Sequence, residues 1–181
     1  GLSVHLDGSR LFNASVALGL PSRRLGLGFD TVTLCLSKGL GCPVGALLAH
    51  GAELAHPVRR LKQLMGGAMR QSGILSAAGL YALDHHVERL AEDHHHARVL
   101  AEGLEELGQL VVEKIPLRTN MVYFEVPDRY SPDRLEQELL AGGVRVSRVH
   151  SRRFRAVTHL DVDSTGITEA LKVFRAVCNR L

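Results

Sequence analysis

The chain of 181 residues lacks most of the features that mark specialised classes of protein. Its formal net charge is only +3, from 22 basic and 19 acidic residues, and this excess is too small and too dispersed to indicate nucleic acid or a membrane surface as a partner. No apolar run approaches the roughly 20 residues that a membrane-spanning helix needs. Internal repeats and low-complexity tracts are missing as well. Because 45% of the residues are hydrophobic, we expect a globular protein with a buried core.

Cysteine is scarce, and its three copies, Cys35, Cys42 and Cys178, have no metal-binding spacing. An odd number of cysteines without such spacing predicts reduced thiols and a cytoplasmic protein. The sequence starts at Gly1 within a predicted strand and lacks the layout of a signal peptide, so we expect further sequence upstream.

Histidine is concentrated in one stretch, but not in a metal-binding pattern. Pairs of histidines that bind a metal from one helix face are usually four residues apart. None of the five has that spacing, and we expect them to line a solvated helix face: His85, His86, His94, His95 and His96.

The first 50 residues alternate between apolar segments and turn-forming residues. Residues 2–6, 30–37 and 44–50 are apolar or rich in β-branched side chains, and each predicts a strand. Between the first two lies a predicted short helix, residues 10–21, which ends near Gly19. The order strand, helix, strand, strand predicts a layered α/β architecture.

Helical periodicity dominates the next part of the chain. Residues 53–65 predict one helix, and the glycine-containing segment 66–73 interrupts the pattern. Apolar residues then recur at helical spacing over residues 74–107, which predicts one long amphipathic helix.

A second αβ unit is predicted from residue 108 onward. Four segments have the composition of strands, at residues 110–115, 120–126, 144–149 and 154–162. Ser131 is a predicted helix N-cap, because Pro132 follows it at the first helical position and two glycines close the segment. A terminal helix completes the chain. We therefore predict two domains, residues 1–107 and a small α+β domain over residues 108–181.

One lysine stands in an unusual setting. Arginine greatly outnumbers lysine, yet Lys38 follows the apolar strand "DTVTLCLS" and is itself followed by Gly39, Gly41 and Pro43. A solvated lysine in a turn would explain this position. So would a lysine that forms a Schiff base, because such a lysine is partly desolvated and small neighbours let a flat cofactor approach the backbone.

An aspartate strengthens the second interpretation. Asp7 ends the first predicted strand, and ligands of α/β sheets bind at the carboxyl ends of strands. Pyridoxal phosphate (PLP) needs an acid beside its pyridine nitrogen. Asp-Gly after a strand is also a common turn signal, so Asp7 alone does not decide between a turn and a site. Asp7 and Lys38, each at the end of its own strand, together favour a PLP site.

Five sequence blocks carry a family resemblance. The blocks "HLDGSRLFNA", "LCLSKGLGCPVG", "GGAMRQSGILSAAGLYALDHHVERLAEDH", "TNMVYFEV" and "RAVTHLDV" occur in this order and cover nearly the whole chain. They resemble the low-specificity L-threonine aldolases, which are PLP enzymes of fold type I. The resemblance implies part of an aspartate aminotransferase-like large domain, followed by the small C-terminal domain.

The resemblance also implies a role for each of five residues. Lys38 would be the PLP-binding lysine and Asp7 the partner of the ring nitrogen. Arg10 would lie beside the cofactor, near the substrate carboxylate. Arg155 would hold that carboxylate, for which its bidentate guanidinium suits it. Arg70 would reach the cofactor phosphate of a neighbouring subunit. Taken without the resemblance, Arg155 could equally be a solvated charge and Arg70 a hydrogen-bond partner of a helix end.

The implied activity is cleavage of L-threonine or L-allo-threonine to glycine and acetaldehyde, by a homo-oligomer that is typically a dimer-based tetramer. The chain departs from the family pattern in length, since members are about twice as long. It also has Gln63 where a lysine is usual, and Ser9 and Ala68 where alanine and glycine are usual. A truncated, non-catalytic remnant, whose stretch 70–107 pairs with a partner, therefore stands beside the enzyme as an alternative.

Overall fold

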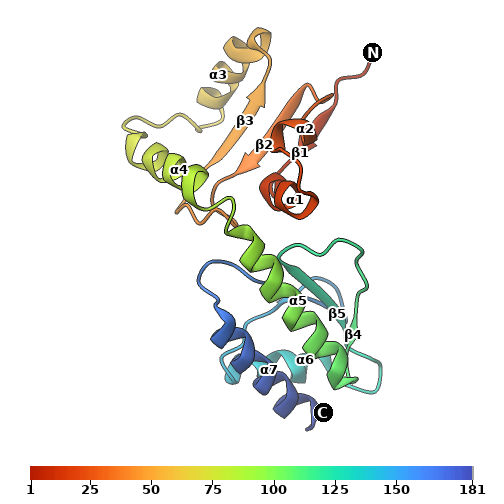
Figure 1. Ribbon diagram of the computed structural model, residues 1–181. Coiled ribbons are helices and arrows are strands. Elements are labelled where there is room, and N and C mark those ends of the chain that lie inside the picture. The colour runs from red at the N-terminus through yellow and green to blue at the C-terminus, as the bar shows by residue number, and fades with distance from the viewer. Residues whose placement is uncertain (181) are drawn as a thin grey trace. The chain divides into compact units, whose positions relative to one another are not determined.

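A computed structural model describes residues 1–180 and divides them into two compact units. The first unit is Gly1–Leu90, and the second runs from Ala91 to the end of the described chain (Figure 1). No helix among the described residues is long and apolar enough to cross a membrane.

The first unit contains a three-stranded sheet in the order β1-β2-β3. Strand β1 (His5–Asp7) is parallel to β2 (Thr31–Cys35), and β2 is antiparallel to β3 (Ala46–His50). A parallel pair needs a crossover connection, which is provided by helices α1 (Leu11–Leu18) and α2 (Ser22–Leu25). The predicted order of strand, helix, strand, strand is thus confirmed, with α2 in addition.

The remaining elements of the first unit are helical. A short 3-10 turn, η1 (Ala52–Leu54), leads into α3 (Ala55–Leu64), and α4 (Gly73–His85) follows after a loop. The core of this unit is small. Ala82 of α4 and Leu90 pack there against residues that follow β2, namely Leu36, Leu40 and Cys42, with Phe12 and Val16 of α1 at the edge.

The long helix expected over residues 74–107 is wrong in one respect. The chain forms two helices, α4 and α5 (Leu90–Leu107), separated by turns at residues 86–89. Ala82 of α4 and Leu90, the first residue of α5, pack in the core of the first unit, whereas Ala97 and Leu104 of α5 pack in the second. The helical periodicity of a sequence segment does not show that its two parts pack in different cores.

The second unit is a four-stranded antiparallel sheet in the order β4-β5-β7-β6. Its strands are β4 (Val111–Val112), β5 (Met121–Glu125), β6 (Ser147–Arg148) and β7 (Arg153–Val157). Helices α5, α6 (Pro132–Ala141) and α7 (Ser164–Cys178) cover one face, and their apolar side chains share one core with the sheet. Strands β4 and β6 are shorter than the sequence predicts.

Two helices of this unit begin with caps that the sequence specifies locally. The Ser131 hydroxyl accepts a hydrogen bond of 3.3 Å from the Arg134 amide, which confirms the predicted N-cap of α6. Asp163 caps α7 in the same way, since its carboxylate accepts from the Gly166 amide at 2.8 Å.

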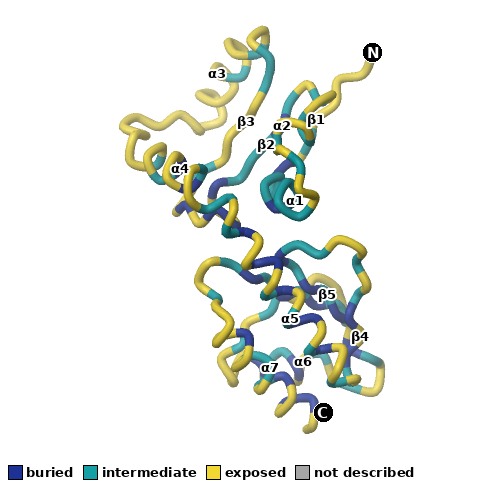
Figure 2. The backbone as a smooth tube through the Cα atoms, viewed as in Figure 1, coloured by how far each residue is buried: buried dark blue, intermediate teal, exposed yellow. Residues whose placement is uncertain are grey.

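Burial differs between the units. Dark, buried segments run through the sheet and helices of the second unit, whereas exposed and half-buried segments dominate the first (Figure 2). By compactness the chain divides between Leu90 and Ala91, because α5 packs in the second core. The functional division at residues 107 and 108 stays a prediction.

Candidate functional site

Asp7 and Lys38 lie at the carboxyl ends of two adjacent parallel strands. Asp7 is the last residue of β1 and pairs with Thr33 of β2, and Lys38 follows the end of β2 by three residues. Their charges interact. The pKa of Asp7 lies below its usual range chiefly because of hydrogen bonds from Ser9, and the Lys38 ammonium lowers it further. The sheet therefore brings together the two residues on which the sequence interpretation depended.

A tight turn orients the Asp7 carboxylate. The Ser9 amide and hydroxyl both donate to Oδ1 of Asp7, at 3.1 and 2.5 Å. Gly8 between them is buried, and a Cβ added there would lie only 2.6 Å from the Thr33 carbonyl oxygen. Glycine is thus needed for β1 to turn this close to β2, and Ser9 holds one carboxylate oxygen.

Residues 36–45, which we call the Lys38 loop, form a compact connection between β2 and β3. Three backbone hydrogen bonds close it: Gly41 donates to Lys38 at 2.9 Å, Cys42 to Leu36 at 3.0 Å and Leu36 to Gly45 at 3.0 Å. Gly41 has a φ of 73°, a value that favours glycine. The loop has a fixed backbone, and so the direction of the Lys38 side chain depends on it.

Lys38 itself is exposed, although the next two residues, Gly39 and Leu40, are buried. The expectation that this lysine is desolvated is therefore wrong for the chain as described. The physical reason is that the chain's own core packs behind the loop, while no described residue covers the side on which Lys38 lies.

The back of the Lys38 loop packs closely on its surroundings. A Cβ added at Gly39 would meet Leu90 Cδ2 at 2.8 Å and Asn13 Oδ1 at 3.3 Å. The thiol of Cys42 lies 3.5 Å from the Ala78 carbonyl, and burial raises its pKa. These contacts fit a small-residue loop that presents one long side chain.

His86 also contacts the back of the loop, and nothing in the sequence predicted this contact. Its Nδ1 lies 2.6 Å from the carbonyl oxygen of Leu40, 46 residues earlier in the chain. A single sequence shows histidine spacing along a helix, but it does not show a carbonyl partner that distant in the chain.

Arg10 precedes α1 at the N-cap position, three residues after Asp7. It is half-buried, and its Nε has no hydrogen-bond partner among the described residues. A buried guanidinium N–H without an acceptor is costly. An anionic group of a ligand would supply the acceptor, which fits the role that the resemblance implies.

Arg155 contrasts with its two arginine neighbours in the second unit. Arg153 bonds Glu113 and stacks on the Tyr123 ring at 4.4 Å, and Arg152 donates to backbone carbonyls, at 2.7 Å to Val126. Arg155, on the same sheet face as Arg153, has a buried Nε without a partner among the described residues. Its neighbours are used for structure, whereas Arg155 is available to an anion.

No contact with a described residue joins Arg70 to the other candidate site residues. It is exposed in the loop between α3 and α4 and forms no hydrogen bond or ion pair with a described residue. The next residue, Gln71, has a φ of 49°, which is uncommon for a residue other than glycine. The chain by itself therefore leaves Arg70 without a partner.

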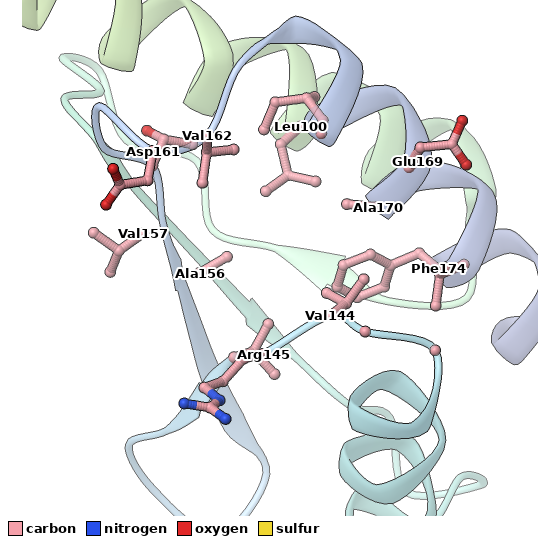
Figure 3. A pocket seen from close by; sticks show the side chains of 17 residues that line it. Leu100, Val144, Arg145, Ala156, Val157, Asp161, Val162, Glu169, Ala170 and Phe174 are labelled. Carbon is pink, nitrogen blue, oxygen red and sulfur yellow. The ribbon is translucent and has the colours of Figure 1, made fainter.

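A cavity of about 350 Å³ lies in the second unit, and Ala156 and Val157 of β7, which follow Arg155, are among its lining residues. Apolar side chains from α5, α7 and the segment before β6 line it, among them Leu100, Val144 and Phe174 (Figure 3). Arg155 itself is not among the lining residues of this cavity.

Comparison with known proteins agrees with this geometry. The family model for beta-eliminating lyases matches residues 1–127. The low specificity L-threonine aldolase of Escherichia coli (strain K12) is 41% identical over 179 residues, a span that covers 99% of this chain and 52% of that protein. The chain thus spans about half the length of the curated relatives it matches.

Solved structures show the same fold at low identity. A putative L-allo-threonine aldolase from Listeria monocytogenes superposes with a TM-score of 0.77 at 19% identity, over 98% of this chain and 52% of that one. A structure of SPT with PLP superposes with a TM-score of 0.69 at 19% identity, over 98% and 47%. The expected fold, that of PLP enzymes of fold type I, is confirmed.

Proposed function

Because the chain belongs to the beta-eliminating lyase family, we propose that it carries the PLP-binding lysine of a threonine aldolase. The proposed reaction is the cleavage of L-threonine or L-allo-threonine to glycine and acetaldehyde, a step of threonine catabolism and glycine formation. The observation that carries the proposal is the placement of Asp7 and Lys38 at the ends of adjacent parallel strands, with an electrostatic interaction between them.

The residues fit the cofactor in three respects. Lys38 has an amine free to bond the aldehyde carbon of PLP, since this amine forms no hydrogen bond or ion pair with a described residue. Asp7 stays ionised because Ser9 and Lys38 lower its pKa, so that its carboxylate can hold a proton at the pyridine nitrogen. The buried Nε of Arg10 lacks an acceptor that an anionic group would provide.

PLP supplies an electron sink for the breaking bond of the substrate. The chain's own residues bind and orient. We assign the substrate carboxylate to Arg155 and Arg10, since each has an Nε without a partner and a guanidinium binds a carboxylate with fixed geometry. We assign Arg70 to the cofactor phosphate of a second subunit, because it is exposed and unpaired in this chain.

Lys38 is exposed in this chain, whereas a lysine that forms a Schiff base is partly desolvated. The proposed enzyme is therefore a longer or assembled one, in which further chain covers Lys38. We propose a cytoplasmic homo-oligomer, a dimer-based tetramer. The three free thiols support the compartment, and the unpaired Arg70 supports the assembly.

The test is covalent trapping. The 181-residue chain is incubated with PLP, reduced with borohydride and digested, and the modified lysine is located by peptide mass. Labelling at Lys38 above the level at the other lysines is expected, unchanged in Lys62→Ala and lost in Lys38→Ala. A separate sample, incubated with PLP but not reduced, is assayed for aldehyde release from threonine. Labelling spread evenly over all lysines would refute a specific site.

A non-catalytic remnant that acts as an interaction module is the alternative. The observation in its favour is the exposed apolar surface of α4, where Ile74 is 83% exposed and Leu80 64% exposed. Absence of Lys38 labelling, together with a stable complex formed through α4, would favour this function over the enzyme.

A further inference from the structure

We propose that His86 is a positioning residue for the Lys38 loop, because its ring holds the buried back of the loop through the Leu40 carbonyl. The contact joins the end of α4 to the residue two positions after Lys38. The loop-holding role is independent of the proposed function. Only its consequence for PLP binding at Lys38 rests on that function.

The hydrogen bond has a defined direction. A carbonyl oxygen only accepts, so Nδ1 of His86 carries the proton and donates to Leu40 at 2.6 Å. Leu40 is only 3% exposed, so water has little access to the loop around its carbonyl. Without the ring, the carbonyl would lose its partner in a mostly buried position, which is costly.

The position of His86 is itself fixed. Its amide donates to the Ala82 carbonyl at 2.8 Å as the last bond of α4, and its ring meets the Tyr81 ring edge-on at 5.5 Å between centroids. The residues on either side of the turn, Ala82 and Leu90, are fully buried in the same core as Leu40. A fixed donor is thus aimed at a loop that has few other long-range polar contacts.

Its neighbour His85 provides a matched comparison. His85 is exposed and stacks on the same Tyr81 ring, at 4.3 Å between centroids, but it forms no hydrogen bond with the loop. Two adjacent histidines at one helix end therefore contact the same ring, but only His86, which is half-buried, bonds to Leu40.

Three variants separate the bond from the packing. His86→Phe keeps a ring of similar size but removes the donor. His86→Asn restores a donor, because the side-chain amide nitrogen lies about as far from Cβ as Nδ1 does. His85→Phe is the control. The measurement is amide hydrogen exchange of the cofactor-free chain, read at Gly41 and Cys42, whose amides close the loop.

We expect exchange at these two amides to be about tenfold faster in His86→Phe, as for the loss of one buried hydrogen bond. His86→Asn and His85→Phe should exchange as the wild type does. The proposal is overturned if His86→Phe leaves the loop unchanged, if His86→Asn behaves like His86→Phe, or if exchange accelerates equally in β2, since the ring would then stabilise the whole unit. Borohydride labelling of Lys38 should fall in His86→Phe alone.

Discussion

The two units differ in how much apolar surface each buries with its own residues. In the second unit Phe124, Phe154 and Phe174 are fully buried and pack ring to ring. In the first unit Leu47 and Leu48 of β3 point to opposite faces of the sheet, and they are 46% and 41% exposed. Helix α3 has no buried residue at all. The unit that carries Asp7 and Lys38 is thus the less self-sufficient one.

The local geometry around Lys38 and the packing of the unit that contains it are separate properties of this chain. The first unit presents its lysine on a well-formed loop, yet residues 46–49 of the neighbouring strand β3 are exposed. The second unit has a large core of its own, and Arg155 there has a buried Nε without a partner among the described residues. A loop can therefore have a fixed backbone while the long side chain that it presents stays exposed.

The largest expected effect is in the core of the second unit. Phe124→Ala should lower the free energy of unfolding of that unit by about 3–5 kcal/mol, because it removes two ring contacts and leaves a cavity. The matched variant in the first unit, Leu80→Ala, should change stability by about 0.5 kcal/mol or less, since Leu80 is 64% exposed. Native-state hydrogen exchange of β5 and α4 measures both. Equal effects would contradict the contrast between the units.

A smaller effect is expected where β1 and β2 meet. Gly8→Ala should destabilise the first unit by about 1–3 kcal/mol, because the added Cβ would lie 2.6 Å from the Thr33 carbonyl oxygen and 3.1 Å from Val32 Cγ1. Gly73→Ala is the control, since a Cβ there meets nothing within 4 Å. Exchange rates of the β1 and β2 amides give the result. If Gly8→Ala matched its control, the close approach of the two strands would be refuted.

An ion pair of the second unit gives a pH-dependent effect. The Glu113 carboxylate bonds Arg153, and this hydrogen bond lowers its pKa in the folded chain. A lowered folded pKa means that the pair stabilises the fold above the unfolded value of 4.5, and that this stability is lost as the pH falls through the folded value.

Because both side chains are about one-third exposed, Glu113→Gln should cost only about 0.5–1 kcal/mol at pH 7. The difference from wild type should shrink as the pH is lowered below 4.5, as measured by urea unfolding over that range. The exposed Glu102→Gln on α5 should show no such dependence. A cost for Glu113→Gln that persists in acid would assign the effect to packing rather than charge.

The smallest expected change is at the candidate site. Ser9→Ala should raise the pKa of Asp7 toward its usual value, since the Ser9 hydroxyl is the largest cause that lowers it. The Ser9 amide and Lys38 continue to act, so the rise should be partial. Carboxyl chemical shifts of Asp7 over an acid titration report the pKa without any cofactor. An unchanged pKa would show that the Ser9 hydroxyl does not contribute, and that the Ser9 amide alone accounts for the effect of Ser9 on the pKa of Asp7.

Several local features were predictable because they depend on neighbours in the sequence. The Ser131 cap forms within three residues, and the order of strands around α1 follows from alternating apolar runs and turns. The break after His85 was not predictable, because residues on either side of it keep the helical period while they pack in different cores. The exposure of Lys38 was not predictable either, since it depends on what lies over the loop.

The sequence by itself determined that Asp7 and Lys38 stand at or just after the ends of neighbouring strands, because residue type and strand order are local properties. Only the tertiary structure decided that His86 holds Leu40, that Arg153 is paired while Arg155 is not, and that Lys38 is exposed. These are properties of partners distant in the chain, and burial and hydrogen bonding are settled only when such partners meet.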